Sequence, residues 1–381
     1  MPKTMTHRER VLAALAHREP DRVPIDFCSN TVTAIHMEGY KNLRQYLGMG
    51  GEPELMHRWQ QIVDVGEEIK RRFEIDFRGV FLGKGDRRVN IELGEGCYKD
   101  KWGVVRTKPP SSYYYDLEKS PLAGEITVGD IARHPWPDPD DPGLTRGLKE
   151  RVERMRRETD YAIVLNLPSA FVQTSQYLRG FHDWFDDCAI SHKLLEALFD
   201  AILEVNLAIC ENALRLVGNQ VDVIYTADDL GTQEGPQFSP ELFLKLFKPR
   251  FKRYFRLMHD LSPAKILFHT CGSVWLFLDD LVDAGIDILN PVQVTAAHMN
   301  TSRLKERYGH ALSFWGAIDT QRVLPRGTVE DVNAEVRRRI GDLADDGGYV
   351  VAAVHNLQPD VPPENILAMY DFAREYGRYT K

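Results

Sequence analysis

The stretch that decides the fold is Lys265-Ile266-Leu267-Phe268-His269-Thr270-Cys271-Gly272, an apolar run that ends abruptly in polar residues and a glycine. Apolar residues resume after Ser273 with helical spacing, so the segment predicts a strand, a turn and a helix. His269 and Cys271 are two residues apart, and side chains at this spacing on an extended segment point to the same side. A thiolate and an imidazole that converge in this way suit zinc, although a His-x-Cys pair alone is a weak motif.

The same alternation of strand and helix extends through most of the chain. Because most expected strands are followed by a helix, the strands should be parallel, and eight of them predict a closed (β/α)8 barrel of the TIM type. The expected strands are Val23–Cys28, Ile75–Leu82, Tyr161–Leu167, Val221–Thr226, Lys265–His269, Ile286–Asn290, Ala311–Trp315 and Tyr349–Val354.

We expect a single domain over residues 1–381, because no linker divides the chain. A capping box from Thr6 to Glu9 predicts an N-terminal helical extension, and a further helix is expected at Leu55–Arg72. Short apolar segments between glycines predict a small antiparallel insertion at about 84–142.

The composition excludes several classes of protein. The chain has 381 residues, 43% of them hydrophobic, and a net charge of −8, so it lacks the basic surface that binds nucleic acid. No apolar run approaches the ~20 residues of a membrane helix, and the first residues do not resemble a secretory signal. The five cysteines show no paired spacing. We therefore expect a cytoplasmic protein with reduced thiols and no membrane or nucleic-acid partner.

Polar residues follow most of the expected strands. In (β/α)8 barrels the chemistry takes place at the carboxyl ends of the strands, so these residues should converge on one site. We expect substrate contacts from Asn30, Asn166, Asp229, Asn290, Trp315 and Asp319.

A metal site is the most specific prediction for this barrel end. His355 closes the apolar run that ends at Val354, so it should lie beside His269 and Cys271. One cysteine and two histidines form a three-ligand catalytic zinc set with one position open. The alternatives are a turn histidine at position 355 and a small buried cysteine at position 271, but the three residues together favour the metal.

Acidic residues in the segment after the strand Val221–Thr226 are candidates for catalysis. Asp228, Asp229 and Glu234 could ligate the metal, orient a ligating histidine or act as an acid or base. Helix capping and loop solvation are equally open for Asp229 and Glu234. Asp228 follows the strand directly, so we expect it to act at the site and to contribute little to stability.

Several longer motifs carry a resemblance to a known family. The chain resembles the uroporphyrinogen decarboxylase superfamily, which contains that decarboxylase and the zinc-dependent, corrinoid-linked methyltransferases. The motifs are Thr6-His7-Arg8-Glu9-Arg10-Val11-Leu12-Ala13-Ala14-Leu15, Asp21-Arg22-Val23-Pro24, Phe238-Ser239-Pro240, His269-Thr270-Cys271-Gly272, Trp315-Gly316-Ala317-Ile318-Asp319 and His355-Asn356-Leu357-Gln358-Pro359-Asp360-Val361-Pro362-Pro363-Glu364-Asn365.

The resemblance favours the methyltransferase branch. The decarboxylase branch has an Arg-Gln-Ala-Gly-Arg loop after its first strand whose arginines bind substrate carboxylates, and the stretch Phe27–Val32 contains no arginine. The methyltransferases use a His-x-Cys pair, matched by His269 and Cys271, and a later ligand that is usually cysteine. His355 stands at that later position.

The resemblance implies a zinc-dependent methyl transfer in which a corrinoid (cobalamin) carries the methyl group. We recognise no corrinoid-binding module in the chain, so a separate corrinoid protein is the expected partner. The small substrate could be a methoxylated aromatic, a methylamine-derived system, a thiol or a folate, and either direction of transfer is open; the aromatic residues near the expected site favour O-demethylation of an aromatic donor. Two alternatives are a cofactor-free decarboxylase and a non-catalytic partner of a corrinoid protein.

Overall fold

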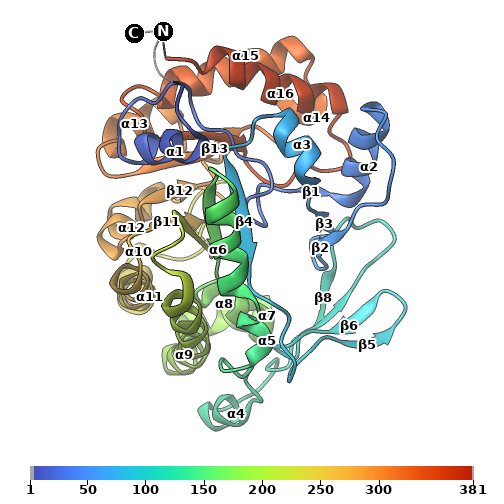
Figure 1. Cartoon of the computed structure of the whole chain (residues 1–381). Coiled ribbons are helices and arrows are strands. Elements are labelled where there is room, and N and C mark those ends of the chain that lie inside the picture. Colours follow the sequence, from blue (N-terminus) through green and yellow to red (C-terminus); the bar gives the residue numbers. More distant parts are fainter. Residues whose placement is uncertain (1–3, 380–381) are drawn as a thin grey trace.

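The computed structural model describes residues 4–379 and is built around a parallel sheet (Figure 1). Seven strands lie in the order β14-β13-β12-β11-β10-β9-β4, so that strands consecutive along the chain are neighbours. They are β4 (Phe77–Phe81), β9 (Ala162–Asn166), β10 (Val223–Ala227), β11 (Lys265–His269), β12 (Ile288–Asn290), β13 (Ser313–Ile318) and β14 (Tyr349–Ala353). This arrangement confirms the α/β barrel predicted from the alternation of strands and helices.

The expected strand Val23–Cys28 closes the sheet between β4 and β14, but only through a single bridge, between Ile25 and Val351. The Val351 N–H donates to the carbonyl of Pro24 (2.9 Å), and the Asp76 N–H donates to the carbonyl of Ile25 (3.0 Å). Pro24 has no N–H, and the Ile25 N–H donates to the carboxylate of Asp76 (2.8 Å) instead of a backbone carbonyl. Two consecutive residues therefore donate no backbone hydrogen bond to a neighbouring strand, which explains why the segment is not a regular strand.

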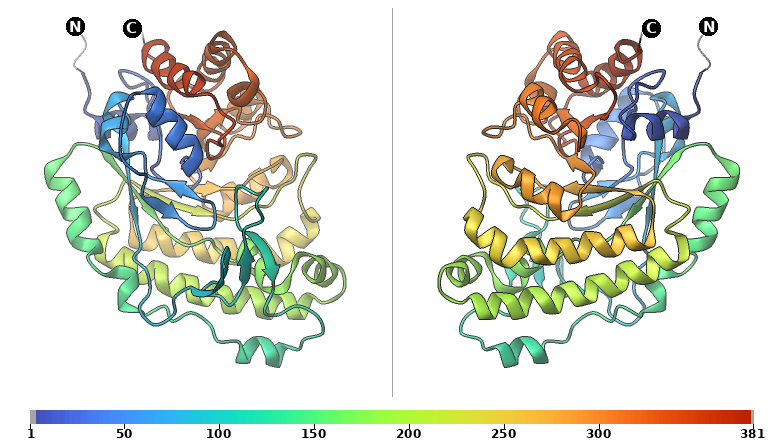
Figure 2. Two further views of the ribbon diagram at one scale, coloured as in Figure 1. Left: turned by 90° about the vertical axis from the view of Figure 1, so that its right-hand side faces the viewer. Right: turned by 90° about the vertical axis from the view of Figure 1, so that its left-hand side faces the viewer.

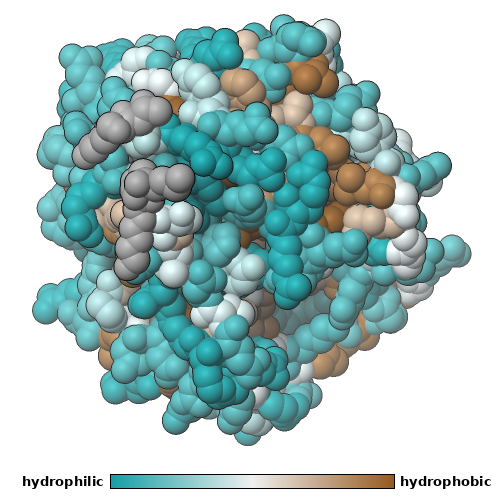
Figure 3. All heavy atoms as spheres, turned by 45° about the horizontal axis from the view of Figure 1, so that its top comes forward, coloured by the Kyte–Doolittle hydropathy of each residue, from teal (hydrophilic) through white to brown (hydrophobic). Residues whose placement is uncertain are grey.

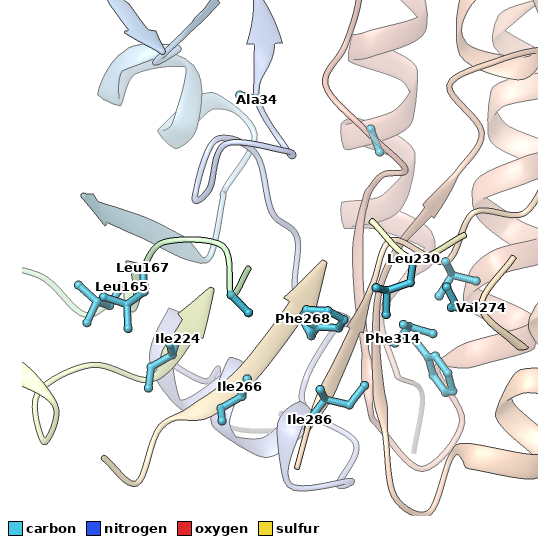
Figure 4. Packing of buried hydrophobic residues seen from close by; sticks show 14 of the residues in the cluster. Ala34, Leu165, Leu167, Ile224, Leu230, Ile266, Phe268, Val274, Ile286 and Phe314 are labelled. Atoms are coloured by element: carbon cyan, nitrogen blue, oxygen red, sulfur yellow. The ribbon is translucent and has the colours of Figure 1, made fainter. Parts of the chain in front are cut away.

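Side chains of the parallel strands alternate between the barrel interior and the surrounding helices. Tyr225 and Leu267 belong to the cluster that fills the interior. Ile224, Ile266 and Phe268 belong to the larger cluster, of which Figure 4 shows a part. The alternation fixes which residues at the strand ends face the barrel axis.

Helices cover the outside of the barrel. The long helices α9 (His192–Val217) and α11 (Lys248–Leu261) pack side by side (Figure 2). The other outer helices and their connecting turns are α5 (Pro142–Thr145), α6 (Leu148–Glu158), α7 (Val172–Arg179), α8 (Phe181–Ile190), α10 (Pro240–Leu242), η1 (Phe243–Phe247), η2 (Trp275–Phe277), α12 (Leu278–Ala284), α13 (Thr301–Tyr308), α14 (Val323–Arg326), α15 (Val329–Leu343) and α16 (Pro363–Tyr376).

The N-terminal part contains helices α1 (His7–Leu15), α2 (Met37–Tyr46) and α3 (Gly66–Arg72). The predicted capping box of α1 is present. The helix expected over Leu55–Arg72 is wrong in its first half, where β2 (Leu55–His57) and β3 (Ile62–Val63) form an antiparallel sheet with β1 (Ile35–His36). Gln61 has a φ of 52° and Gly66 a φ of 74°, so a continuous right-handed helix cannot pass through them.

A four-stranded antiparallel sheet lies between β4 and β9 in the chain. Its strands are β5 (Ile91–Gly94), β6 (Cys97–Lys99), β7 (Val105–Thr107) and β8 (Asp116–Lys119), and helix α4 (Val128–Arg133) follows. The sheet projects to one side of the barrel (Figure 1).

The surface is mainly hydrophilic on the face seen in Figure 3, where hydrophobic residues occupy small areas. Among residues 4–379, none of the helices is both long enough and apolar enough to cross a bilayer.

Candidate metal centre

The strand ends place a ring of side chains at the carboxyl end of the barrel. Leu267 on β11 faces the interior of the barrel, so His269, two residues later on the same strand, also faces the interior. His269 pairs with Ala227 on β10 and with Asn290 on β12. The same period of two directs Asn166 inward at the end of β9. The local sequence therefore determines which strand-end residues meet.

His269, Cys271 and His355 converge at this end. One potential ligand atom from each lies within 4.8 Å of the others, and the Cys271 Sγ is 3.3 Å from the His269 Nε2. The His269 and His355 rings have centroids 5.6 Å apart. A tetrahedral zinc ion with usual bond lengths separates a sulfur and a nitrogen ligand by about 3.5 Å, so the donor set fits zinc in both chemistry and spacing.

Asn290 fixes the tautomer of His269. The Asn290 Nδ2 donates to the carbonyl of Trp315 (3.0 Å), which leaves its Oδ1 facing the His269 Nδ1 at 2.6 Å. The imidazole therefore carries its proton on Nδ1 and presents the lone pair of Nε2 towards Cys271. A hydrogen bond of this kind orients a metal-binding histidine and increases its basicity.

Burial sets the protonation of all three groups. It lowers the pKa of His269, and together with the charge of His269 it lowers the pKa of His355, so both imidazoles favour the neutral form that binds metals. Burial and the nearby charge of Asp229 raise the pKa of the Cys271 thiol. A cation at the centre would reverse that effect, because a coordinating thiol is deprotonated.

Asp229 lies just beyond the end of the neighbouring strand β10 and is close to both Cys271 and His269. Its Oδ1 accepts a hydrogen bond from the Cys271 N–H (2.8 Å) and lies 3.8 Å from the His269 Nε2. The Gln173 Nε2 donates to its Oδ2 (3.4 Å). Asp229 thus holds the Cys271 backbone in place while facing the open space beside the histidines.

Asp228 has a different position from the one expected. Its carboxylate is fully buried and accepts hydrogen bonds from the N–H groups of Phe171, Val172 and Gln173 at 2.8, 3.0 and 2.8 Å. Burial raises the pKa of Asp228 to about 7, although the three hydrogen bonds act to lower it. The expectation that Asp228 acts at the site and contributes little to stability is corrected: the residue holds the N-terminus of α7.

Of the other expected site residues, Asn166 alone faces the cavity next to the metal centre. Its Nδ2 donates to the Ser29 carbonyl (3.0 Å), and its Oδ1 is buried without a hydrogen-bond partner among the described residues. An unpaired buried oxygen is available to a ligand. Asn290 orients His269 as described above and does not line the cavity.

The remaining four residues do not face the cavity. Asn30 accepts hydrogen bonds from two N–H groups of its own turn, and the Asp319 Oδ1 does the same. Glu234 is exposed in a loop. Trp315 is fully buried in the middle of β13, where its Nε1 donates to Asp26 (3.0 Å). The expected strand ended at Trp315, but β13 continues to Ile318, so the indole lies deep in the barrel.

A cavity of about 460 Å³ opens beside the histidines. It includes residues that the sequence did not point to, from the β2–β3 region, the insertion, the barrel strands and helix α7. They are His57, Trp59, Gln60, Phe81, Lys101, Gln173 and Tyr225. The inward positions of Tyr225 on β10 and of Phe81 on β4 could have indicated these two residues; His57, Trp59, Gln60 and Lys101 come from segments without a periodic pattern.

The family of the chain follows from its sequence matches. The family described as uroporphyrinogen decarboxylase (URO-D) matches residues 117–376, and the chain belongs to it. The chain is similar to the uroporphyrinogen decarboxylase of Methylococcus capsulatus, with 26% identity over 68% of this chain and 71% of the relative. It is also similar to the uroporphyrinogen decarboxylase of Alkalilimnicola ehrlichii, with 24% identity over 95% of this chain and 92% of the relative.

The fold is similar to that of a solved methyltransferase from Methanosarcina mazei. The TM-score is 0.68 at 17% sequence identity, over 98% of this chain and 99% of the methyltransferase. At that identity the likeness supports the barrel fold, in agreement with the family match.

Proposed function

We propose that the protein is a zinc-dependent methyltransferase that transfers a methyl group between a small substrate and a corrinoid held by a separate protein. The observation that carries the proposal is the convergence of His269, Cys271 and His355 beside a cavity. Zinc held by these three residues would act as a Lewis acid on the oxygen of a methyl ether or on an acceptor thiol.

The protein's own residues prepare such a centre. Asn290 leaves the His269 Nε2 free to bind, and Asp229 fixes the backbone of Cys271. The buried, neutral imidazoles need no deprotonation before they coordinate. Three protein ligands leave a fourth position for substrate, as catalytic zinc sites require.

The cavity favours a methoxylated aromatic compound as the methyl donor. Trp59, Phe81 and Tyr225 supply aromatic walls, and the volume of about 460 Å³ lies in the range of small-molecule sites. In the transfer the methyl C–O bond would break with its electron pair left on the substrate oxygen, and a reduced corrinoid supplied by the partner protein would accept the methyl group. The corrinoid protein would dock at the carboxyl end of the barrel, because the methyl carbon has to come within ~3–3.5 Å of its acceptor atom.

Decarboxylation is the second candidate, because the two curated relatives are uroporphyrinogen decarboxylases. Among the residues that the structure describes, no arginine lines the cavity. A porphyrinogen with many carboxylates would need several such cations. A decarboxylase would also have no use for a thiol and two imidazoles at zinc spacing.

Metal analysis followed by a spectroscopic assay tests the proposal. We expect about one zinc per chain in the purified protein, or after zinc addition to chelator-treated protein. The zinc-loaded protein should then transfer methyl groups from methoxylated aromatics to cob(I)alamin, which is followed by the visible spectrum of the corrinoid. The reverse assay supplies methylated cobalamin with thiol or folate acceptors.

Two results would contradict the proposal. A protein that neither contains nor takes up zinc cannot work in this way. Full release of carbon dioxide from a carboxylic acid by chelator-treated protein, without corrinoid turnover, would establish the decarboxylase.

A further inference from the structure

We propose that Lys101 forms an anion subsite in the cavity and receives the carboxylate of an aromatic acid whose methyl ether lies at the metal centre. This inference deepens the proposed function by naming its substrate class, and it rests on that function only for the placement of the ether. The subsite itself is argued from the insertion that carries Lys101.

Lys101 lies in the turn between β6 and β7 and lines the cavity. Within residues 4–379 its ammonium group has no hydrogen-bond or ion-pair partner. Burial lowers the pKa of Lys101, although the negative charges of Asp100 and Asp141 act to raise it. Lys101 is half-buried, and an ammonium group that loses part of its hydration without gaining a partner is unfavourable. An anion bound in the cavity would supply the missing partner.

The two nearby carboxylates are engaged elsewhere. Asp100 accepts the N–H groups of Trp102 (2.9 Å) and Val104 (3.0 Å) and binds the Arg106 Nε (3.2 Å). Asp141 accepts three backbone N–H groups, from residues 86, 87 and 143. Neither carboxylate forms an ion pair with Lys101, although the charges of both act to raise its pKa.

Arg106 and His57 are two further titratable groups near Lys101, and the charges of Arg106 and Lys101 both act on His57. Arg106 is 6% exposed, and its Nη1 has no hydrogen-bond partner among the described residues. It stacks on Trp59, with the guanidinium carbon 4.5 Å from the ring centroid. Burial and the charges of Arg106 and Lys101 lower the pKa of His57 to about 4, so His57 is neutral and can donate or accept a hydrogen bond.

The anion subsite and the metal centre lie in different charge environments. Asp100 and Asp141, whose charges act on Lys101, both lie in the insertion, whereas Asp229 lies beside the proposed ligands, with its Oδ1 3.8 Å from the His269 Nε2. Trp59, Phe81 and Tyr225 supply aromatic surface in the same cavity. A ring with a methyl ether and a carboxylate on separate carbons matches this combination of groups.

Calorimetry with matched pairs of compounds tests the subsite without methyl transfer. The compounds are 2-, 3- and 4-methoxybenzoate and the corresponding methoxybenzyl alcohols, which keep the ring and the ether but lose the charge. We expect zinc-loaded protein to bind at least one acid about 10- to 100-fold more tightly than its alcohol, as for a charge-assisted hydrogen bond. The Lys101→Met variant should lose this preference, and Lys101→Arg should keep part of it.

Lys99→Met is the matched control, because Lys99 lies on β6 of the same sheet and does not line the cavity. It should preserve the preference for the acid. Equal binding of acid and alcohol by the wild type, an unchanged preference in Lys101→Met, or no binding of any acid would overturn the proposal. A Lys101-dependent affinity for 3-mercaptopropionate but not for the benzoates would assign the anion to a thiol acceptor and overturn the aromatic acid.

Methyl transfer is measured separately on the same proteins. If the acids bind through Lys101 but no methyl group reaches cob(I)alamin, the subsite stands and the proposed function fails. If acids and alcohols are demethylated equally and Lys101→Met changes neither, the proposed function stands and the subsite is wrong.

Discussion

The Asn290 Oδ1 lies 2.6 Å from the His269 Nδ1, and this one hydrogen bond sets the direction of the His269 lone pair. The two residues are register partners on adjacent strands, so the contact is built into the sheet. The orientation of the proposed metal ligand is thus as rigid as the barrel itself.

Removing this hydrogen bond should weaken metal binding without unfolding the protein. Asn290→Ala leaves the His269 Nδ1–H unpaired, so the imidazole can rotate or change tautomer. We expect zinc affinity to fall about 10- to 100-fold, the usual effect of losing a residue that orients a ligand. Competition with a chromophoric chelator measures the change. Asn333→Ala, on the outer helix α15, is the control and should retain wild-type affinity.

Cys271→Ala should remove most of the zinc while the circular dichroism spectrum stays unchanged. The thiolate is the only soft, charged donor of the set, and two imidazoles alone bind zinc weakly. Zinc content by mass spectrometry checks this result. Cys97→Ala removes a half-buried thiol from the insertion and should leave the zinc content unchanged; an equal loss in both variants would argue against a site at Cys271.

Position 355 offers a substitution that should be tolerated. His355→Cys supplies the donor type that the related methyltransferases usually place there, so zinc should remain bound. His355→Ala removes the donor and should lower zinc affinity as strongly as Cys271→Ala. Retention of full affinity by His355→Ala would show that another group, such as Asp229, completes the site.

Asp228→Asn should destabilise the fold. The amide can offer only its oxygen to the three N–H groups of the α7 N-terminus, and its own NH2 group would face donors. We expect a loss of about 1–3 kcal/mol in the free energy of unfolding, as for other unsatisfied buried donors. Urea denaturation provides the measurement. Glu234→Gln, in the exposed loop nearby, should change neither stability nor zinc content.

The buried Asp76 predicts a pH dependence of stability. Burial alone would raise its pKa, but the charges of Arg22 and Arg10 and the hydrogen bond from His7 outweigh burial and lower it. Because the pKa is lower in the folded state than in the unfolded state, this stabilisation is complete above the ordinary carboxyl pKa of ~4. It is lost as the pH falls through the folded value.

Asp76→Asn removes the buried carboxylate that pairs with both Arg22 and Arg10, of which Arg10 keeps its ion pair with Asp21. The loss should lower the free energy of unfolding at pH 7 by about 3–5 kcal/mol. The Arg10 Nη1 and the Arg22 Nη1 are 2.7 and 2.8 Å from this carboxylate. Urea denaturation of the variant and the wild type from pH 7 to pH 3 should show the difference shrinking below about pH 4. A difference that stays constant down to pH 3 would contradict this account.

The barrel and the convergence of His269, Cys271 and His355 could be predicted from the sequence because both depend on local periodicity. A side-chain period of two directs Leu267 and His269 to the same side of β11, and parallel strands bring their carboxyl ends together. The spacing of His269 and Cys271 and the position of His355 after an apolar run were sufficient to predict that the three would meet.

Features that depend on long-range packing could not be predicted in this way. The sequence favoured Asp228 over Asp229 for a role at the site, yet Asp228 binds the start of α7 and Asp229 binds the backbone of Cys271. The expected strand ended at Trp315, but β13 continues because its pairing with β14 extends to Ile318. Lys101 reaches the cavity from a turn whose direction is set by the fold of the whole insertion.

The cavity is built from two parts of the chain. The proposed metal ligands lie at or just beyond the ends of barrel strands, within the part that matches the family, residues 117–376, whereas Lys101 and His57 lie before it. Exchange of the segment around β5–β7 for that of another family member would therefore alter which compound is accepted while leaving the ligands at positions 269, 271 and 355 intact. The same scaffold could diversify its choice of substrate through this segment, and chimeric proteins made at its borders would be a practical route to new specificities.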